Sequence, residues 1–289
     1  MRYDLSTIVR RSQNPRRKTI DIRPIAPPGM LAQALFARCY RPVVNAWAAV
    51  LPRIMAEYER SIAMRDGQPS HLTIGAPDLI TDSISSLSDL LDAIGRELSD
   101  LVLQLLPELR EWAARVESWH RGQWRGAVLS ATNVDIEAVL LASGTPQSVR
   151  DSIAWNTSLI SDVSDQARQR IANIVFAGMR DNRPARDIAR ELREAVGLSR
   201  QRSLRIASDQ LVKLTSSLDR ERRAEAGIRT WKWRWSHKKH GRPEHIARDG
   251  KVYADTAALA GDGVLPPPDD LPGTLPFCGC RSQAVLSLG

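Results

Sequence analysis

Apolar residues recur every three or four positions along most of this chain, which is the spacing of helices that bury one face. The first such stretch is predicted over residues 29–64. Pro42 and Pro52 fall inside it and should kink or divide the helix, because proline lacks the backbone N–H that a helix needs. The glycines and prolines of residues 66–77 then predict a linker.

Two longer apolar stripes follow this linker. A leucine-rich seam predicts a long helix over residues 79–106, and its pattern continues to Trp119. A second helical region is predicted over residues 135–179, with a break near Gly144-Thr145-Pro146. These patterns indicate long helices that pack against neighbouring helices.

Two helices with readable boundaries are predicted before residue 228. Pro184 suits the first turn of one helix, which should end at Gly197. Ser199 can cap the next helix, which should end at Gly227. The buried face of this second helix is predicted to contain Leu204, Ala207, Leu211, Leu214 and Leu218.

The apolar period changes from 3.6 to 2 just after this helix. Trp231, Trp233 and Trp235 alternate with Lys232 and Arg234, which predicts a strand with three indoles on one face and two cations on the other. Since three exposed indoles would form a costly apolar patch, the tryptophans are interpreted as the structural core of a C-terminal module. A stacking platform for single-stranded nucleic acid is the alternative, with the cations on phosphates.

The predicted fold class is mostly α, with long helices and a small β-rich C-terminal module, or α+β overall. Further short strands are predicted at residues 252–253 and 284–286. The chain is predicted to contain an extended basic N-terminal arm (1–28), a helical domain (29–150), a helical domain with a basic face (151–228) and the small β-rich C-terminal module (229–289). In one interpretation, a bound metal ion stabilises this module.

Positive charge is concentrated in two segments. The 289-residue chain has a formal net charge of +8 and a pI of about 9.8. Residues 200–248 contain 14 Lys and Arg against five Asp and Glu, and residues 1–23 contain seven against two. Such segments fit a polyanionic partner such as DNA or RNA, although solvated basic helix faces are the alternative. The candidate nucleic-acid-binding residues are Arg202, Arg205, Lys213, Arg220, Arg222, Arg223, Lys232 and Arg234.

The cysteine content and hydropathy exclude some classes. Three cysteines, with Cys39 alone inside a helical pattern, do not make a disulfide framework, which favours a cytosolic origin. No run of about 18 apolar residues is present, so no membrane-spanning segment is expected. The basic N-terminus lacks the apolar core of a secretory leader.

Soft and borderline metal ligands gather at the two ends of the C-terminal module. His240, His245, Cys278 and Cys280 could supply the four tetrahedral donors of a zinc site, with His237 as a substitute. In the alternative interpretation, the cysteines are free thiols, the histidines are exposed and the tryptophans form the core.

The same histidines raise the question of catalysis. These three histidines lie close enough in sequence to Glu244 and Asp249 to act with them as acid–base groups of a metal-dependent hydrolase or nuclease. The histidines are His237, His240 and His245. However, no glycine-rich phosphate loop, nucleophile elbow or paired-carboxylate motif accompanies them. No catalytic residue is therefore assigned, and the chain is not expected to be an enzyme.

The order of motifs in the last sixty residues resembles the C-terminal signature of the Mu F-like minor head, or head morphogenesis, proteins of phages. The signature consists of a tryptophan, a charged turn ending in Cys or His, an Asp-Gly turn, a Pro-Pro step and a Cys-Arg-Cys. The corresponding residues here are Trp231 to Trp235, Arg242-Pro243-Glu244-His245, Asp249-Gly250-Lys251-Val252-Tyr253, Pro266-Pro267-Pro268 and Cys278-Gly279-Cys280-Arg281.

This resemblance covers about the last 140 residues and implies a minor virion component of a tailed phage. Such a protein would lie in the head interior or at the portal vertex, after assembly in the host cytoplasm. It would contact the portal or major capsid protein and packaged double-stranded DNA, and no membrane. It would assist assembly, DNA packaging or ejection. A free-standing nucleic-acid-binding protein and a metal-dependent nuclease or hydrolase are the alternatives.

The chain departs from the signature at three positions. Arg242 occupies a presumed ligand position of the charged turn, Phe277 replaces the asparagine before the first cysteine, and Gly279 replaces the central arginine between the cysteines. A zinc site with four protein ligands would therefore need His240 or His237 in addition to His245.

Overall fold

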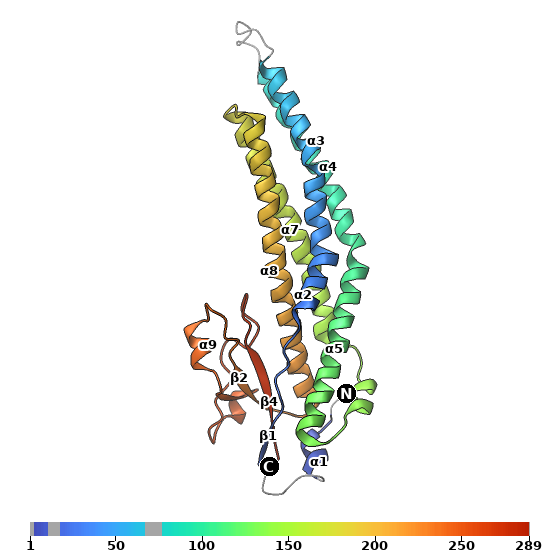
Figure 1. The fold of residues 1–289 in the computed structure, drawn as a ribbon, viewed down its shortest axis with the longest axis vertical. Coiled ribbons are helices and arrows are strands. Elements are labelled where there is room, and N and C mark those ends of the chain that lie inside the picture. Colours follow the sequence, from blue (N-terminus) through green and yellow to red (C-terminus); the bar gives the residue numbers. More distant parts are fainter. Residues whose placement is uncertain (1–2, 11–17, 67–76, 289) are drawn as a thin grey trace. The chain divides into compact units, whose positions relative to one another are not determined.

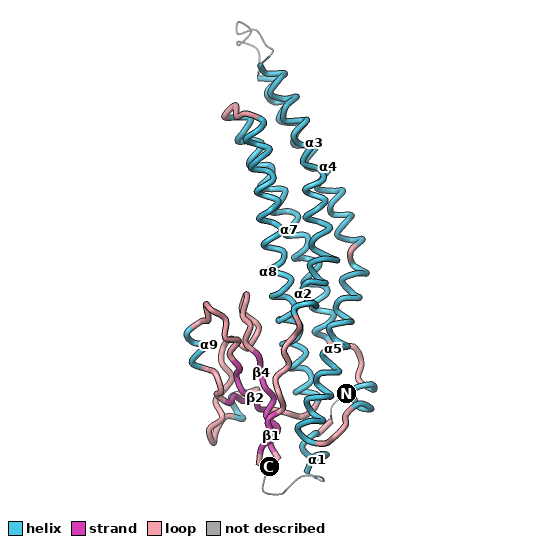
Figure 2. The backbone as a smooth tube through the Cα atoms, in the orientation of Figure 1, coloured by secondary structure: helices cyan, strands magenta, loops and turns pink. Residues whose placement is uncertain are grey.

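A computed structural model describes residues 3–10, 18–66 and 77–288 of this chain. The described part is mostly helical with one small antiparallel sheet, which confirms the predicted class (Figures 1 and 2). The helices are α1 (Leu5–Arg10), α2 (Gly29–Leu35), a π-helix (Phe36–Tyr40), α3 (Arg41–Asp66), α4 (Pro77–Gln104), α5 (Leu106–Thr132), α6 (Glu137–Ala142), α7 (Gln147–Arg180), α8 (Ala185–Glu225) and α9 (Pro243–Ala247). The strands are β1 (Thr19–Asp21), β2 (Thr230–Arg234), β3 (Val252–Ala254) and β4 (Arg281–Ser287).

The chain divides into two compact units that are not continuous in sequence. Unit 1 consists of Met1–Gln33, Arg110–Ala154 and Ile206–Gly289, and unit 2 consists of Ala34–Leu109 and Trp155–Arg205. This differs from the predicted sequential domains, because a long helix can contribute to the cores of two units along its length. Of the linker predicted over residues 66–77, residues 67–76 lie outside the described residues, and its two end residues belong to α3 and α4.

Unit 2 is a helical assembly with polar links inside an apolar core. The apolar stripe predicted for residues 29–64 lies mostly in α3, which continues through Pro52, and the π-helix directly precedes it. The indole N–H of Trp47 donates to Ser164 Oγ at 3.1 Å, and the Tyr40 hydroxyl donates to Asn156 Oδ1 at 3.1 Å. These bonds satisfy polar groups that burial would otherwise destabilise.

Helix α8 is one continuous element, so the predicted stop at Gly197 is wrong. Ser199 does not cap a new helix, since its hydroxyl donates back to the Ala195 carbonyl at 3.1 Å within the same helix. The predicted end at Gly227 is confirmed. Gly227 has a φ of 69°, and the Ile228 N–H donates to the Arg223 carbonyl, which is the pairing of a Schellman cap.

The sheet has the strand order β1-β4-β2-β3, with every pair antiparallel. Figure 1 shows β4 between β1 and β2. Residues directly opposite in an antiparallel pair share a face of the sheet. Trp231 lies opposite Ala284 and Tyr253, and Lys232 lies opposite Gln283. The tryptophans and the cations of β2 therefore lie on opposite faces, as predicted.

Two apolar clusters form the core of unit 1. One joins residues of α1, β1, α5, α6 and β4, including Leu5, Ile20, Trp124 and Leu286. The other cluster is the core of the C-terminal module and contains Trp231, Trp233, Tyr253, Cys278 and Cys280.

The prediction of an extended N-terminal arm is wrong for two described segments. Leu5 and Val9 of α1 are fully buried in the core of unit 1, and β1 pairs with β4 from Thr19 to Asp21. The basic charge of the segment concealed a short apolar pattern at Leu5, Val9, Ile20 and Ile22. Residues 11–17 lie outside the described part of the chain.

None of the helices within the described residues is both long enough and apolar enough to cross a lipid bilayer.

Candidate metal centre

One histidine and two cysteines converge in the core of the C-terminal module. His245 Nδ1 lies 3.5 Å from Cys278 Sγ and 3.6 Å from Cys280 Sγ. All three ligand atoms lie within 4.8 Å of one another, and all three residues are buried. We call this group the His-Cys-Cys cluster. It contains three of the four residues predicted for zinc.

Two segments far apart in sequence bring these side chains together. His245 lies on the short helix α9, which begins at Pro243, a residue suited to the first helical position. Cys278 lies in the loop that precedes β4, and Cys280 is the residue directly before that strand. The cluster therefore connects the turn after β2 to the start of β4.

Neighbouring side chains fix the orientation of the His245 ring. Its Nε2 lies 2.6 Å from Asp270 Oδ2, and Arg248 forms an ion pair with the same carboxylate. The edge of the ring packs against Trp233, with ring centroids 4.9 Å apart. The Arg248 guanidinium lies over the Trp233 ring, 5.0 Å from its centroid. Nδ1 is thereby directed at the two sulfur atoms.

The environment favours the charged forms of Asp270 and Cys278 but not that of Cys280. Burial alone would raise the pKa of Asp270, but hydrogen bonds from Arg248 and His245 outweigh it and lower that pKa. The hydrogen bond from Cys280 lowers the pKa of Cys278 to about 5, while the same bond and burial raise the pKa of Cys280. Cys278 is therefore the more acidic of the two thiols.

The loop that contains Cys278 is anchored on both sides. Phe277 has a φ of 59°, a left-handed conformation that is costly for a bulky residue. Its N–H donates to Asp209 Oδ1 of α8 at 2.6 Å, and its carbonyl accepts from Lys238 Nζ at 2.7 Å. These contacts hold the strained residue in place and position the cysteine that follows it.

Gly279, which replaces the signature's arginine, lies in a site that excludes side chains. A Cβ at this position would lie 2.9 Å from Ser236 Cβ and 2.7 Å from Lys238 Cε. The glycine therefore allows the two cysteines to approach the turn after β2.

His237 and His240 lie outside the cluster. Both are exposed, and neither belongs to the group of converging ligand atoms in the described residues. The His237 ring packs beside Trp235, with centroids 4.5 Å apart. The prediction that one of these histidines completes the site is therefore wrong for this arrangement. Asp270 and Arg248, which support His245, were missed because a Gly- and Pro-rich loop has no periodic pattern that marks a contact.

The cluster can serve two kinds of chemistry. A cysteine, a histidine and an aspartate in series are also the parts of a thiol nucleophile with its base and orienting group. However, Cys278 is only 3% exposed and Cys280 only 2% exposed, so a macromolecular substrate has no direct access. Burial of two thiols and an imidazole together suits metal binding better, because thiolates and neutral imidazole are the preferred ligands of zinc.

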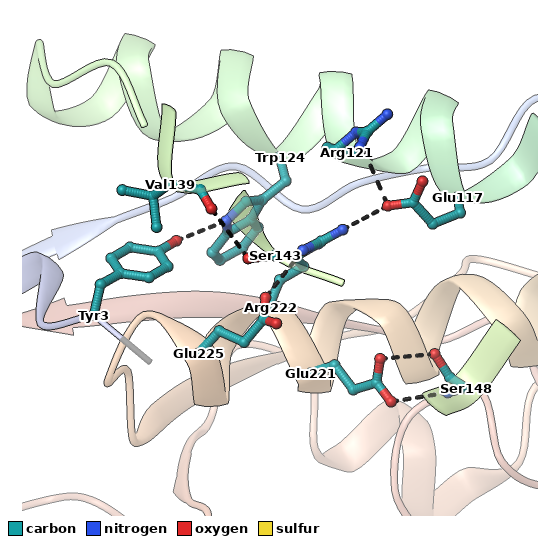
Figure 3. Close-up of polar contacts among 10 residues, drawn as sticks. All are labelled: Tyr3, Glu117, Arg121, Trp124, Val139, Ser143, Ser148, Glu221, Arg222 and Glu225. Atoms are coloured by element: carbon teal, nitrogen blue, oxygen red, sulfur yellow. Dashed lines mark hydrogen bonds and ion pairs between the residues drawn. The ribbon is translucent and has the colours of Figure 1, made fainter. Parts of the chain in front are cut away.

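The predicted basic face of α8 is partly an interior face. Arg222 is 1% exposed and lies between Glu117 Oε1 at 2.6 Å and Glu225 Oε2 at 3.0 Å (Figure 3). Arg223 is 3% exposed, lies 5.4 Å from the Trp231 ring centroid and pairs with Asp255. The prediction that these two arginines bind nucleic acid is wrong, since burial and pairing remove both from the surface.

Several other predicted cations already have partners. Lys213 pairs with Asp209 at 2.8 Å, and Lys232 pairs with Asp21 at 2.5 Å. Arg220 donates to Ser217 Oγ, and burial lowers its pKa. Arg202 donates to Gln166 and lies 3.7 Å from Asp162. Of the eight predicted residues, Arg205, Arg220 and Arg234 have no ion pair within the described part of the chain, and Arg220 is held by its hydrogen bond to Ser217.

Arg234 has a neighbour that sequence reasoning missed. Arg281 of β4 lies directly opposite it, on the sheet face away from the tryptophans. Like charges in this register repel each other, and neither arginine is ion-paired among residues 3–10, 18–66 and 77–288. We call these two residues the Arg234–Arg281 pair. The strand predicted at residues 284–286 did not include Arg281, where β4 begins in the structure.

The burial of the tryptophans distinguishes a structural core from a stacking platform for single-stranded nucleic acid. Trp231 is 1% exposed and Trp233 is fully buried, so neither can stack on an incoming base. Trp235 is half-buried at the end of β2 and packs against the same cluster. The interpretation of the tryptophans as core is confirmed for the first two.

Comparisons with known proteins agree with the signature. The chain is 26% identical over 192 residues to an uncharacterized protein of Haemophilus influenzae, covering 66% of this chain and 41% of that protein. The chain thus spans less than half the length of this curated relative. No solved structure gives a significant match.

The family comparison covers the C-terminal part of the chain. Residues 169–283 match the family described as Phage Mu protein F like protein. This range includes α8, the tryptophan strand, α9 and both cysteines of the His-Cys-Cys cluster. The match confirms the resemblance to Mu F-like phage head morphogenesis proteins.

Proposed function

We propose that this chain is a minor head protein of a tailed phage, present in the virion near the portal and the capsid, where it assists assembly, DNA packaging or ejection. The observation that carries the proposal is the match of residues 169–283 to Phage Mu protein F like proteins. The portal or major capsid protein and packaged double-stranded DNA are the proposed partners. The proposed role is structural, because the His-Cys-Cys cluster is buried.

The first experiment tests the virion role. The gene would be deleted in the phage or prophage that encodes it, and particles would be examined by electron microscopy and mass spectrometry. We expect fewer normal heads, rescue by a plasmid copy, and the protein in wild-type particles at far lower abundance than the major capsid protein. A normal yield without the gene, or purified particles that lack the protein, would contradict the proposal.

The Arg234–Arg281 pair is the proposed DNA contact. Two unpaired arginines opposite each other would be relieved by a phosphate, to which arginine donates in a bidentate manner. In the double variant Arg234→Gln, Arg281→Gln, binding to duplex DNA should weaken regardless of sequence. The slope of log K against log salt should fall by about 1 for each arginine–phosphate interaction that the substitutions remove.

Arg125→Gln provides the matched control for this measurement. Arg125 is also an arginine of unit 1, but it already pairs with Asp135 at 2.6 Å and Glu137 at 2.8 Å. We expect its substitution to leave the salt slope unchanged. Equal slopes for the double variant and the wild type would remove the pair from the proposal.

A further inference from the structure

We propose that His245, Cys278 and Cys280 bind one zinc ion as its only protein ligands, with Asp270 as the outer partner of the histidine. This set differs from the four-residue set predicted from sequence, since it leaves out His240 and adds a carboxylate behind the imidazole. The proposal rests on the geometry of the His-Cys-Cys cluster and does not depend on a role in head assembly.

The distances between the ligand atoms fit a tetrahedral ion. For a zinc ion with Zn–S of about 2.3 Å and Zn–N of about 2.05 Å, tetrahedral angles place sulfur and nitrogen about 3.6 Å apart. The two observed separations from His245 Nδ1 are 3.5 Å and 3.6 Å. Both sulfur–nitrogen separations thus already have the value that coordination requires. Both cysteines are free and reduced.

Charge balance explains how such a centre can be buried. Two thiolates and a neutral imidazole cancel the charge of one zinc ion, and Asp270 is balanced by Arg248. A buried centre without net charge avoids the large cost of an uncompensated ion.

The partner of His245 selects the tautomer that a metal needs. Asp270 accepts a hydrogen bond from Nε2, which leaves the Nδ1 lone pair directed at the sulfur atoms. Metal-binding histidines commonly donate their second ring N–H to a carboxylate, which fixes the ring and raises its basicity as a ligand. Asp270 therefore acts as a positioning residue.

The ion would fasten α9 to the start of β4. Cys278 and Cys280 are themselves core residues of the module, alongside Trp231, Trp233 and Tyr253. A core this small gains much of its stability from a metal, because the unfolded chain has no preformed site. The three protein ligands leave a fourth position for a small ligand such as water.

The test measures zinc in the full chain after purification under reducing conditions and again after reconstitution of the chelated protein with zinc alone. We expect about one zinc per chain from the two thiolates and the imidazole. The double variant Cys278→Ser, Cys280→Ser should bind none. Cys39→Ser provides the matched control, because this third cysteine is also buried but lies in unit 2, and it should retain the zinc.

Two further measurements keep the proposal testable if the double variant unfolds. Cobalt added to the chelated wild-type protein should produce the absorption bands of thiolate-to-cobalt charge transfer, and these should be absent in His245→Ala. The variants His237→Ala and His240→Ala should both retain one zinc.

Three outcomes would overturn the assignment. Reduced, folded wild-type protein that binds no zinc would remove the site. Loss of zinc in His240→Ala would restore a site with four protein ligands in place of the one proposed. Cys278 and Cys280 recovered as a disulfide under reducing purification would assign them a redox role.

Discussion

Two buried histidines of unit 1 are each held by an aspartate, and they differ in what faces the second ring nitrogen. His120 of α5 places Nε2 2.9 Å from Asp219 Oδ1 of α8, and its buried Nδ1 has no hydrogen-bond partner within the described residues. His245 has the same kind of bond to Asp270, but its Nδ1 faces two thiols. The pair of His120 with Asp219 therefore links helices α5 and α8. The pair of His245 with Asp270 instead orients a ring nitrogen that can bind a metal.

This comparison shows that a buried His–Asp pair is not by itself a functional site. The two helices that the His120 pair links are also joined by Arg222 of α8, which pairs with Glu117 of α5 and with Glu225 of its own helix (Figure 3). Near His245 the surroundings are soft sulfur donors. The identity of the atoms at the free nitrogen, and not the pair, determines whether metal chemistry is available.

The largest effect is expected from breaking the pair of His120 with Asp219. In His120→Ala, Asp219 remains buried without its partner, and a cavity replaces the ring. We expect the free energy of unfolding, measured by urea denaturation, to fall by about 3–5 kcal/mol. The zinc content should stay unchanged. The exposed His237→Ala serves as control, and a similar small loss in both variants would show that the buried pair contributes little.

A smaller effect is expected from weakening the pair of His245 with Asp270. In Asp270→Asn, the carboxylate behind His245 is replaced by an amide, so the imidazole loses its charged partner. We expect zinc affinity, measured by competition with a chelator, to fall about 10–100-fold, with the fold retained when zinc is saturating. The adjacent and exposed Asp269→Asn should bind zinc like the wild type. Equal affinities in both variants would contradict the positioning role.

The rate at which the cysteines react with an alkylating reagent distinguishes protection by a bound metal from protection by burial alone. Burial raises the pKa of Cys39 to about 12, so this thiol should react slowly with an alkylating reagent with or without zinc. Cys278 and Cys280 should be protected only while zinc is bound. Mass spectrometry of labelled peptides over time would show this, and equal labelling of all three cysteines after chelation would count against the site.

The smallest effect is expected at an exposed carboxylate outside both pairs. Asp4 accepts hydrogen bonds from Ser6 and Thr7 at the start of α1, and these lower its pKa from 3.8 to about 2. Because the folded state has the lower pKa, the stabilisation is present above pH 3.8 and is lost as the pH falls towards 2. Asp4→Ala should cost about 0.5–1 kcal/mol at neutral pH. Thermal denaturation between pH 2 and 7 would measure the stability at neutral pH and its loss in acid. If the acid transition of the variant equals that of the wild type, Asp4 does not stabilise α1 in this way.

Much of the fold could be predicted from periodicity alone. The change from helical to alternating spacing at Trp231 located the only strand with a strong pattern, and Gly227 marked the end of the helix before it. The stop at Gly197 was misplaced because a glycine inside a long helix is tolerated where neighbours support it. Strand β1 was missed because three residues are too few to show alternation.

The candidate site was predictable in its chemistry but not in its partners. Cys278, Cys280 and His245 stand out as residue types that bind metals. Their exact grouping depends on tertiary contacts, namely the anchor from Asp209 to Phe277 and the support from Asp270, which no local spacing encodes. The prediction that buried arginines of α8 bind nucleic acid was wrong for a related reason. Counting charges cannot tell a solvated arginine from Arg222, which is buried between two glutamates.

The position of β4 between β1 and β2 has a consequence for how the protein is made. Its partners are translated first, since β1 lies near residue 20 and β2 near residue 232, while β4 spans Arg281–Ser287. Until the ribosome has released β4, both partners present unsatisfied edges, and closure must then join segments far apart in sequence, which slows folding. The nascent protein is therefore exposed to premature pairing with other chains throughout the synthesis of the residues that separate β1 from β4.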